Sequence, residues 1–421
     1  MSGTRVVVTG LGTISPLALT APRHFERVLA GESAVEKLDD PAYRNYPPIL
    51  HARVQNFDRR ELIPDRMLRK LLSPSPAYAL AAATEALRDA GLAGTNLIDC
   101  GIYIGSVCLD ADPEAFIPAL RESIDTTDNV DLGRFATHGI KLIDPLFLVK
   151  SLPNAGLCAI AIQHQALGPN ANITNGSVSG LQAIIGAMDA LRRGDAEMVL
   201  AGGYDSLLRM DSVVDHLLAG RLAGNGLEPA KACRPFDRRR SGYALAEGAA
   251  FLMLETPEHA QKRGARIYGE LRASGQTAVP QNFLEQRAED DGLAACARQA
   301  LDDDDQGVDL ILGDGLANAL DDGRELHAAA AVANGRPVPY SAFTGSFGFP
   351  GAAAGAFSLV HAMLAIHGGV MPPMINCEEP AADANVDLVR EPRAASMKRV
   401  LVWTSDRGIK NAAVLAAAPE H

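Results

Sequence analysis

The chain has 421 residues, of which 47% are hydrophobic and 21% charged, and its formal net charge is −12. This length allows two ordinary domains or one large duplicated fold with a substantial core. Because Lys and Arg are scattered through an acidic chain, nucleic acid and anionic membrane surfaces are poor partners. The sequence has no run of about 18 uninterrupted apolar residues and no signal-peptide pattern at its start, so we expect a cytoplasmic protein without a membrane span.

The cysteines do not form a metal-binding or disulfide pattern. They stand far apart and include no CxxC pair, at Cys100, Cys108, Cys158, Cys233, Cys296 and Cys377. This spacing fits a protein of a reducing compartment. We therefore expect neither a metal nor a cofactor.

Short β-branched runs alternate with longer Ala- and Leu-rich stretches, which is typical of an α/β fold. In the first part of the chain, strands are expected at Val6–Thr9, Ile102–Ile104 and Met198–Ala201, and helices at Ala77–Ala90 and Gly180–Arg193. Glycines after both helices, Gly91 and Gly194, are good helix ends.

A second α/β pass begins near residue 265. Strands are expected at Ile267–Leu271, Leu310–Leu312 and Arg399–Thr404, and helices at Gly292–Leu301 and Ala352–His367. Two passes predict one compact, pseudo-duplicated unit with halves at residues 1–260 and 261–421. The segment 110–152 is the least regular and is interpreted as an insertion in the first half.

Several segments resemble the β-ketoacyl synthases of fatty acid and polyketide synthesis, in the same order along the chain. They are Val6–Gly12 with Ser15–Leu17, Ser151–Asn154 with Gly168–Asn170, Leu191–Ala196 with Ala201–Gly203, Arg234–Asp237, and Gly242–Ala249. The resemblance spans nearly the whole chain. It implies a thiolase-like fold with a layered αβαβα architecture.

Active members of that family use a cysteine at a helix N-terminus, two histidines and a lysine. At the matching positions this chain has Ser177 for the cysteine, Asp314 for the first histidine, Thr344 for the lysine and Phe349 for the second histidine. A one-residue slip in the alignment before Gly355 supplies neither a histidine nor a lysine. All four reactive positions are thus replaced.

The family's glycine-rich C-terminal loop is also changed. In active members its phenylalanine gates the nucleophile, whereas this chain has Asp406, Arg407 and Gly408 followed by Ile409. This remnant of the gating loop is a fifth change that points away from catalysis.

Ser177 could still be a nucleophile, but a serine hydroxyl needs a neighbouring base. The Gly-x-Ser-x-Gly elbow is not met, because Val178 stands at its centre. We therefore favour a filler role for Ser177 and a structural role for Asp314. Four histidines lie outside the family motifs and are assigned no role: His138, His164, His216 and His361.

Residues after the strand at Ile102–Ile104 fall where the family lines its acyl tunnel at a dimer interface. Cys108 lies there, and Phe116, Ala119 and Leu120 fall on one face of a predicted helix. Core packing explains this face equally well; the sharper hypothesis is a tunnel wall shared with a partner. Family dimers also pair an edge strand across their two-fold axis, for which Met198–Ala201 is the candidate.

The whole pattern resembles the chain length factor, the non-catalytic subunit that pairs with an active ketosynthase in type II polyketide synthases. The resemblance implies two partners, an active ketosynthase and an acyl carrier protein with the growing chain. Larger side chains at the tunnel end should then shorten the product. Chain length factors for aromatic polyketides commonly have glutamine in place of Ser177, so a branch for polyene or other reduced chains is indicated.

Two alternatives stay open. In the first, the chain is a serine-dependent acyltransferase in which Ser177 accepts an acyl group. In the second, it is an inactive homodimer with a binding or regulatory role.

Overall fold

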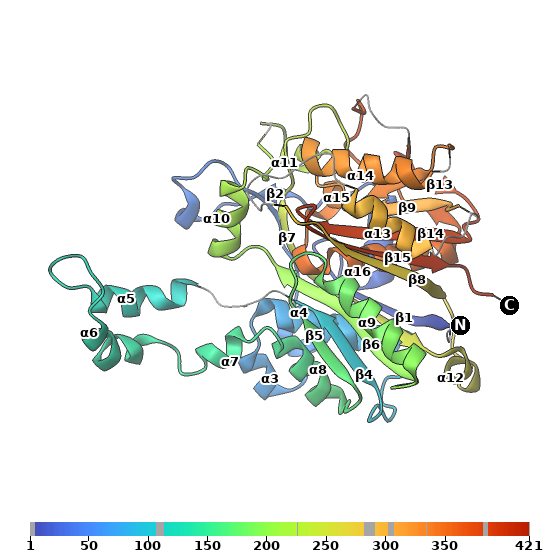
Figure 1. Cartoon of the computed structure of the whole chain (residues 1–421). Coiled ribbons are helices and arrows are strands. Elements are labelled where there is room, and N and C mark those ends of the chain that lie inside the picture. The colour runs from blue at the N-terminus through green and yellow to red at the C-terminus, as the bar shows by residue number, and fades with distance from the viewer. Residues whose placement is uncertain are drawn as a thin grey trace.

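The computed structural model describes residues 5–106, 113–224, 226–281, 291–301, 307–333, 335–381 and 386–420 (Figure 1). Its centre is a large mixed β-sheet with helices packed on both sides and between its two halves. The chain passes twice through the same arrangement of strands, once in each half.

Five strands follow the same order in each half, and the second half has one further short strand, β12 (Asp387–Leu388), outside the first of its five. In the first half, the strands lie in the order β5 (Asn170–Ile173), β4 (Gly101–Gly105), β6 (Met198–Ser206), β7 (Leu245–Glu255) and β1 (Val6–Ile14). In the second half the order is β10 (Pro339–Ala342), β9 (Leu310–Gly313), β14 (Arg399–Asp406), β15 (Lys410–Ala417) and β8 (Gly269–Ala278).

The directions of the strands match as well. In each half the first three strands of this order are parallel and the remaining pairs antiparallel. The two sheets join where β1 and β8 pair. The sequence therefore correctly predicted a duplicated α/β fold, and the fold is thiolase-like.

Helices form three layers around the two sheets. The outer layer of the first half consists of α4 (Pro74–Asp89) and α8 (Ala155–His164), and that of the second half of α13 (Gly292–Leu301) and α14 (Ala319–Val332). Between the sheets lie α9 (Ser179–Arg193) and α16 (Ala354–Gly368), which contact each other. This is the αβαβα layering that the resemblance implied.

Smaller elements complete the described fold. The helices are α1 (Ala21–Leu29), α2 (Arg59–Leu62), α3 (Arg66–Leu71), α10 (Met210–Leu218), α11 (Pro229–Ala232), α12 (Pro257–Lys262) and α15 (Thr344–Phe347), with 3₁₀ turns η1 (Pro41–Tyr43) and η4 (Gly351–Ala353). The short strands are β2 (Glu36–Lys37), β3 (Leu50–Ala52), β11 (Val370–Met371), β12 (Asp387–Leu388) and β13 (Arg393–Ala394).

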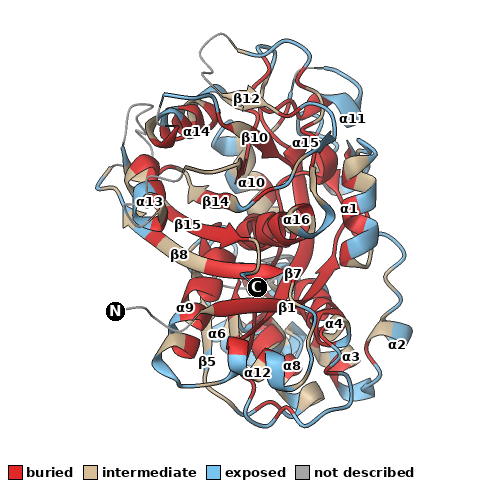
Figure 2. Ribbon diagram, turned by 90° about the vertical axis from the view of Figure 1, so that its right-hand side faces the viewer, coloured by how far each residue is buried: buried red, intermediate tan, exposed pale blue. Residues whose placement is uncertain are grey.

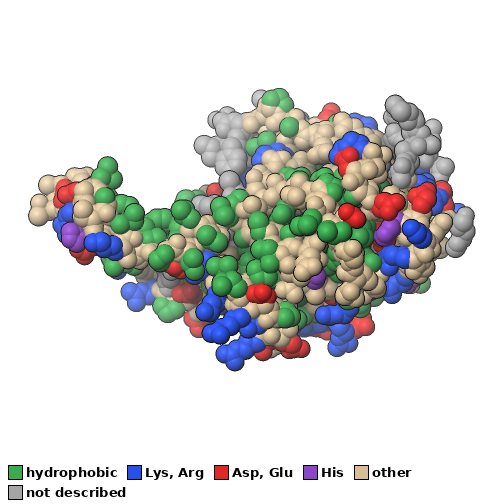
Figure 3. Space-filling model, turned by 90° about the horizontal axis from the view of Figure 1, so that it is seen from below, with side chains coloured by type: hydrophobic (Ala, Val, Ile, Leu, Met, Phe, Trp, Pro, Cys, Tyr) green, Lys and Arg blue, Asp and Glu red, His purple; other side chains and the backbone are tan. Residues whose placement is uncertain are grey.

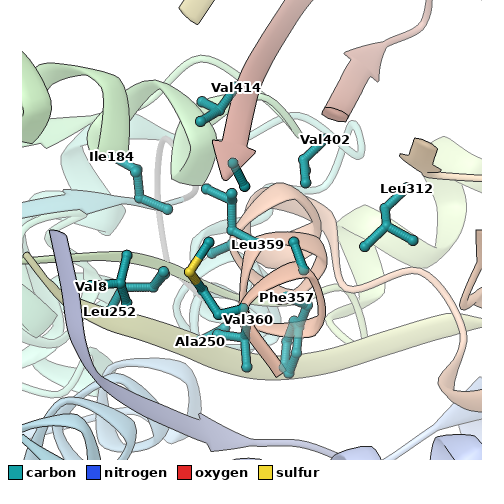
Figure 4. Packing of buried hydrophobic residues seen from close by; sticks show 14 of the residues in the cluster. Val8, Ile184, Ala250, Leu252, Leu312, Phe357, Leu359, Val360, Val402 and Val414 are labelled. Atoms are coloured by element: carbon teal, nitrogen blue, oxygen red, sulfur yellow. The ribbon is translucent and has the colours of Figure 1, made fainter. Parts of the chain in front are cut away.

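Helix α16 is the centre of the core (Figures 2 and 4). Its residues Phe357, Leu359 and Val360 pack against strands of both halves and against α9, and all three are buried. The segment Gly351–Gly368 is long and apolar enough for a membrane span, but 83% of it is buried inside the protein. We therefore assign it as a core helix.

Two glycines allow α4 to lie directly on β1. A Cβ atom at Gly10 would lie 2.3 Å from the carbonyl oxygen of Ala86, and one at Gly12 would lie 2.0 Å from that of Ala82. Only residues without a Cβ fit such a backbone approach. The Gly10-Leu11-Gly12 run is thus a packing feature within the strand.

The prediction that Met198–Ala201 forms an edge strand was wrong. Met198–Ala201 lies within β6, which is hydrogen-bonded to β4 on one side and to β7 on the other. The free edge of the first half is β5, because it ends the strand order. The sequence misled because the start of β6, Met198–Ala201, is an apolar run, whereas the edge strand reads Asn-Ala-Asn-Ile and looks like a loop.

The insertion forms an arm, defined here as residues 113–152. It contains η2 (Pro113–Phe116), α5 (Ile117–Ser123), α6 (Leu132–Thr137), η3 (Gly139–Leu142) and α7 (Phe147–Ser151). Figure 1 shows α5 and α6 standing away from the body of the protein. Within the arm, Gly139 packs so closely on α5 that its Cβ would lie 2.5 Å from Oγ of Ser123.

Gly12→Ala is expected to destabilise the protein by about 2–3 kcal/mol, because the new methyl group would force α4 away from β1. The matched control is Gly323→Ala in α14, where a Cβ meets nothing within 4 Å. That change should be neutral or stabilise by roughly 0.5–1 kcal/mol. Urea unfolding of both variants checks the pair, and equal effects would contradict the packing argument.

Candidate functional site

Ser177 lies between the edge strand β5 and the first turn of α9. Gly176 before it has φ +71°, a value that favours glycine. The turn is closed by Ser179, whose Oγ accepts from the backbone N–H of Asn175 at 2.7 Å and donates to the Gly176 carbonyl at 2.6 Å. This local structure presents residue 177 at a helix N-terminus, where a thiolate would be stabilised.

A cavity of about 280 Å³ lies beside Ser177. It is lined by residues from both halves of the chain: Gly176, Ser177, Asp205, Leu207, His216, Arg221, Tyr243, Leu316, Phe349, Gly351, Ala352, Ser405, Asp406 and Arg407. The cavity therefore brings together Ser177, Phe349 and two residues of the gating-loop remnant, Asp406 and Arg407.

The Asp406 carboxylate covers Ser177. Ser177 Oγ donates to the carbonyl oxygen of Ser405 at 3.2 Å and lies 3.4 Å from Asp406 Oδ1. A Cβ at Gly176 would lie only 2.3 Å from Asp406 Oδ2. A negative side chain thus stands beside the start of α9, where the helix dipole favours an anion. The Asp406 carboxylate thus takes the place beside the helix N-terminus where a thiolate at position 177 would be stabilised.

Asp314 is buried and has a structural contact. Its Oδ2 accepts from Oγ1 of Thr404 at 3.0 Å and from the backbone N–H of Ser405 at 2.9 Å, while Oδ1 has no hydrogen-bond partner among the described residues. Burial, and then the nearby Glu325 carboxylate, raise the pKa of Asp314 well above the ordinary value of a carboxyl group. The residue at the first histidine position therefore fixes the end of β14.

Glu325 supports the same turn from α14. Its two carboxylate oxygens accept from the backbone N–H groups of Asp314 and Gly315, each at 2.8 Å. Burial raises the pKa of Glu325 as well. The backbone at positions 314 and 315 is thus held by side-chain hydrogen bonds.

Thr344 and Phe349 fill the remaining reactive positions. Together with Asp314 they border a gap of only about 20 Å³, too small for more than one water molecule. Thr344 Oγ1 donates to the Gly315 carbonyl, and the Phe349 ring lies 5.1 Å from that of Tyr243. The structure therefore brings all three replaced positions together and packs the space between them.

His216 and Tyr243 line the cavity, and the sequence analysis assigned no role to either. His216 Nδ1 lies 2.7 Å from the Tyr243 hydroxyl. Burial lowers the pKa of His216 to about 4, so the imidazole is neutral at pH 7. Tyr243 can act as donor or acceptor in this hydrogen bond, depending on which ring nitrogen of His216 carries the proton. No local motif marks His216 in the sequence; α10 carries it to the cavity.

The expected tunnel residues lie apart from this cavity. Cys108 falls outside the described residues. Phe116, Ala119 and Leu120 belong to the arm, where Ala119 is buried, Leu120 is 40% exposed and the Phe116 ring lies 4.5 Å from that of Phe147. None of these three arm residues lines the cavity. Among the described residues no group of three or more His, Cys, Asp or Glu side chains could hold a metal ion.

The fold and the geometry of the site together define a thiolase-like protein. Two family descriptions match the chain: "Beta-ketoacyl synthase, N-terminal domain" over residues 3–260 and "Beta-ketoacyl synthase, C-terminal domain" over residues 268–378. The chain belongs to the β-ketoacyl synthase family.

Individual relatives are distant but match along their whole length. A 3-oxoacyl-[acyl-carrier-protein] synthase 2 of Coxiella burnetii is 28% identical over 97% of this chain and 96% of its own. The oxytetracycline polyketide beta-ketoacyl synthase 1 of Streptomyces rimosus is also 28% identical, over 99% and 97%.

Solved structures agree with the fold. A chain of the AntDE:AntF complex, described as a type II polyketide synthase acyl-carrier protein with its ketosynthase bound to the hexaketide, has a TM-score of 0.86. It is 26% identical and covers 99% of this chain and 100% of that one. A chain of "the ishigamide ketosynthase/chain length factor" has the same TM-score at 25% identity, with 99% and 100% coverage.

Asp314→Asn is expected to flatten the dependence of stability on pH. The folded state holds the Asp314 proton more tightly than the unfolded chain, so this contribution to stability is present below the ordinary carboxyl pKa. It is lost as the pH rises through the raised pKa. The unfolding free energy of the variant relative to the natural chain should therefore increase from pH 5 to pH 8 in urea titrations. A difference that does not change with pH would contradict a raised pKa at Asp314.

Proposed function

We propose that this chain is a non-catalytic chain length factor that pairs with an active ketosynthase and helps to shape the tunnel for the growing acyl chain. The observation that carries the proposal is the fate of the four reactive positions. Ser177 is covered by Asp406, Asp314 anchors β14, and Thr344 and Phe349 are packed around a gap of about 20 Å³.

The side chains at these positions cannot supply the groups that the family's reaction needs. Decarboxylation and condensation need a good nucleophile and donors for a developing oxyanion. Ser177 hydrogen-bonds to a carbonyl and a carboxylate, both of which are acceptors and neither of which is an imidazole. Phe349 and Thr344 offer no cation. A structural role for these positions explains all the contacts that they make.

The exposed apolar surface of the arm supports the proposal that this chain binds a protein partner (Figure 3). Eleven of the eighteen large hydrophobic side chains found exposed on the described surface belong to it: Ile117, Leu120, Ile124, Val130, Leu132, Ile140, Leu142, Leu146, Leu148, Val149 and Leu152. Figure 3 shows hydrophobic side chains continuing from the arm onto the body. Near the free edge strand β5, Ile162 and Leu167 are also exposed, by 63% and 74%. An apolar surface of this extent beside an unpaired strand edge fits a stable interface.

The remaining assignments belong to the same proposal. The partners are an active ketosynthase and an acyl carrier protein that delivers the chain, and no cofactor or metal takes part. The protein works in the cytoplasm, the chain divides into halves near residue 260, and the products are polyene or other reduced chains. Phe116, Ala119, Leu120 and Cys108 are the proposed tunnel or interface residues.

The first test is co-expression with the ketosynthase encoded beside this chain, followed by an elongation assay with Ser177→Ala in this chain. Because Ser177 is proposed to carry no acyl group, the rate should stay within about twofold of the natural complex. Replacement of the partner's nucleophilic cysteine should abolish the product. Loss of elongation with Ser177→Ala in an intact complex would overturn the proposal.

A serine-dependent acyltransferase is the second candidate, and the presence of His216 in the Ser177 cavity is the observation that favours it. A general base must reach the hydroxyl proton, however, and Ser177 Oγ donates to the Ser405 carbonyl and toward Asp406, while His216 Nδ1 bonds to the Tyr243 hydroxyl. Incubation with acyl carrier protein and mass analysis of the Ser177 peptide separates the candidates. A stable acyl group on Ser177 would support the acyltransferase.

Native mass distinguishes a heterodimer from an inactive homodimer, and the arm supplies the variant. Leu148→Glu, at a side chain that is 75% exposed on α7, should weaken the complex with the ketosynthase about tenfold or more. The matched control is Leu218→Glu on α10, which is 81% exposed and lies outside the arm. A homodimer of this chain, or equal effects of the two variants, would contradict the proposed heterodimer interface.

A further inference from the structure

The turn between β14 and β15 lies directly over Ser177. Its residues Asp406 to Ile409 form a tight hairpin turn in which the N–H of Ile409 donates to the Asp406 carbonyl at 3.0 Å. Arg407 and Gly408 both have positive φ, 54° and 72°. Asp406 pairs with Lys410, so three residues form the loop, and a positive φ at the first of them is usual for Asn, Asp or Gly. Arginine there is strained, so an interaction of its side chain has to hold it in place.

The Arg407 side chain has such an interaction. Its guanidinium forms an ion pair with Asp215 on α10, and the Arg407 side chain is only 13% exposed. This contact ties the tip of the turn to a helix of the other half of the chain.

A second anchor comes from α14. The guanidinium of Arg324 lies against Gly408, where a Cβ would be 2.5 Å from its Cζ. Arg324 in turn pairs with Asp321 at 3.2 Å, and Asp321 also pairs with Arg221. All three side chains are at most 9% exposed. Breaking such a buried network is costly, so the support under the turn is rigid.

The base of the turn is held by Asp314, through the hydrogen bonds to Thr404 and Ser405 described above. Oγ of Ser405 also donates to Oδ1 of Asn411 at 2.8 Å and accepts from the N–H of Gly408 at 3.1 Å. The anchors therefore include Asp314, at the position of the family's first histidine, and Arg407, in the remnant of the gating loop.

We propose that the turn 405–409 is a closed lid over Ser177, held by the Arg407–Asp215 ion pair and by the Arg324 network. The replacements that removed the catalytic groups thus also build a contact that shuts the former nucleophile position off from incoming acyl groups. This inference rests on the non-catalytic role proposed above and adds a physical barrier to it.

The experiment uses Ser177→Cys in the full chain and follows the rate at which iodoacetamide alkylates residue 177, read from peptide masses. Exposed Cys158 is an internal reference, and the same peptide in urea gives the unprotected rate. A closed lid should slow the reaction at least about a hundredfold relative to urea, since labelling then needs local opening. Labelling as fast as in urea would overturn the proposal.

Two substitutions, each added to Ser177→Cys, are expected to open the lid: Asp215→Asn and Arg407→Ala. Adding Asp215→Asn should speed labelling about fivefold, as expected for loss of a partly buried ion pair. Asp211→Asn is the matched control, because Asp211 lies on the same helix but pairs with Arg209 at 3.2 Å. Equal rates in the Asp215 and Asp211 variants would contradict the lid.

Arg407→Ala distinguishes the access of iodoacetamide to residue 177 from the reactivity of the Cys thiol introduced there. Arg407 is a cation that lines the cavity beside residue 177, so its removal alone would lower the thiolate fraction and slow alkylation. If the lid opens, alkylation accelerates instead. Slower labelling would overturn the lid, while the proposed non-catalytic role is judged separately by elongation with Ser177→Ala.

Discussion

The architecture depends on one place where backbone meets backbone between the two halves. A Cβ at Gly180, in the first turn of α9, would lie 2.5 Å from the carbonyl oxygen of Ala352, and one at Gly203, in β6, would lie 2.7 Å from the same atom. No side chain fits there, so the start of α9 and the segment before α16 are held at a fixed distance. Ser177 stands three residues before this contact and Phe349 three residues before Ala352. The positions of Ser177 and Phe349 are thus set by a glycine contact in which neither side chain takes part.

The arrangement of strands, in contrast, could be predicted well from the sequence. The alternation of β-branched and Ala-rich runs predicted the duplicated fold because the core strands and central helices are buried and their patterns strong. Helix Gly180–Arg193 and strand Leu310–Leu312 were placed almost as the structure has them. The edge strand was not found, because β5 has only four residues, Asn-Ala-Asn-Ile, and an alternation this short cannot be told from a loop.

The site could be predicted only in part. Family motifs located Ser177, Asp314, Thr344 and Phe349, and the structure brings them around one region. The family motifs did not identify His216 or Arg324 as site residues. Both lie on helices whose local sequence does not indicate that they face the site. Nor could the motifs show that Asp314 binds Ser405 and that Asp406 covers Ser177, because such contacts depend on where a hairpin turn and a helix start meet in space.

The arm has a consequence for how the protein is made. A free chain would carry eleven exposed apolar side chains on a projecting segment of helices, next to an unpaired strand edge. Surfaces of this kind bind chaperones or one another when no partner covers them. A chain whose arm stays uncovered is therefore an aggregation hazard in a crowded cell. The shape of the arm thus favours covering of this surface soon after the chain leaves the ribosome.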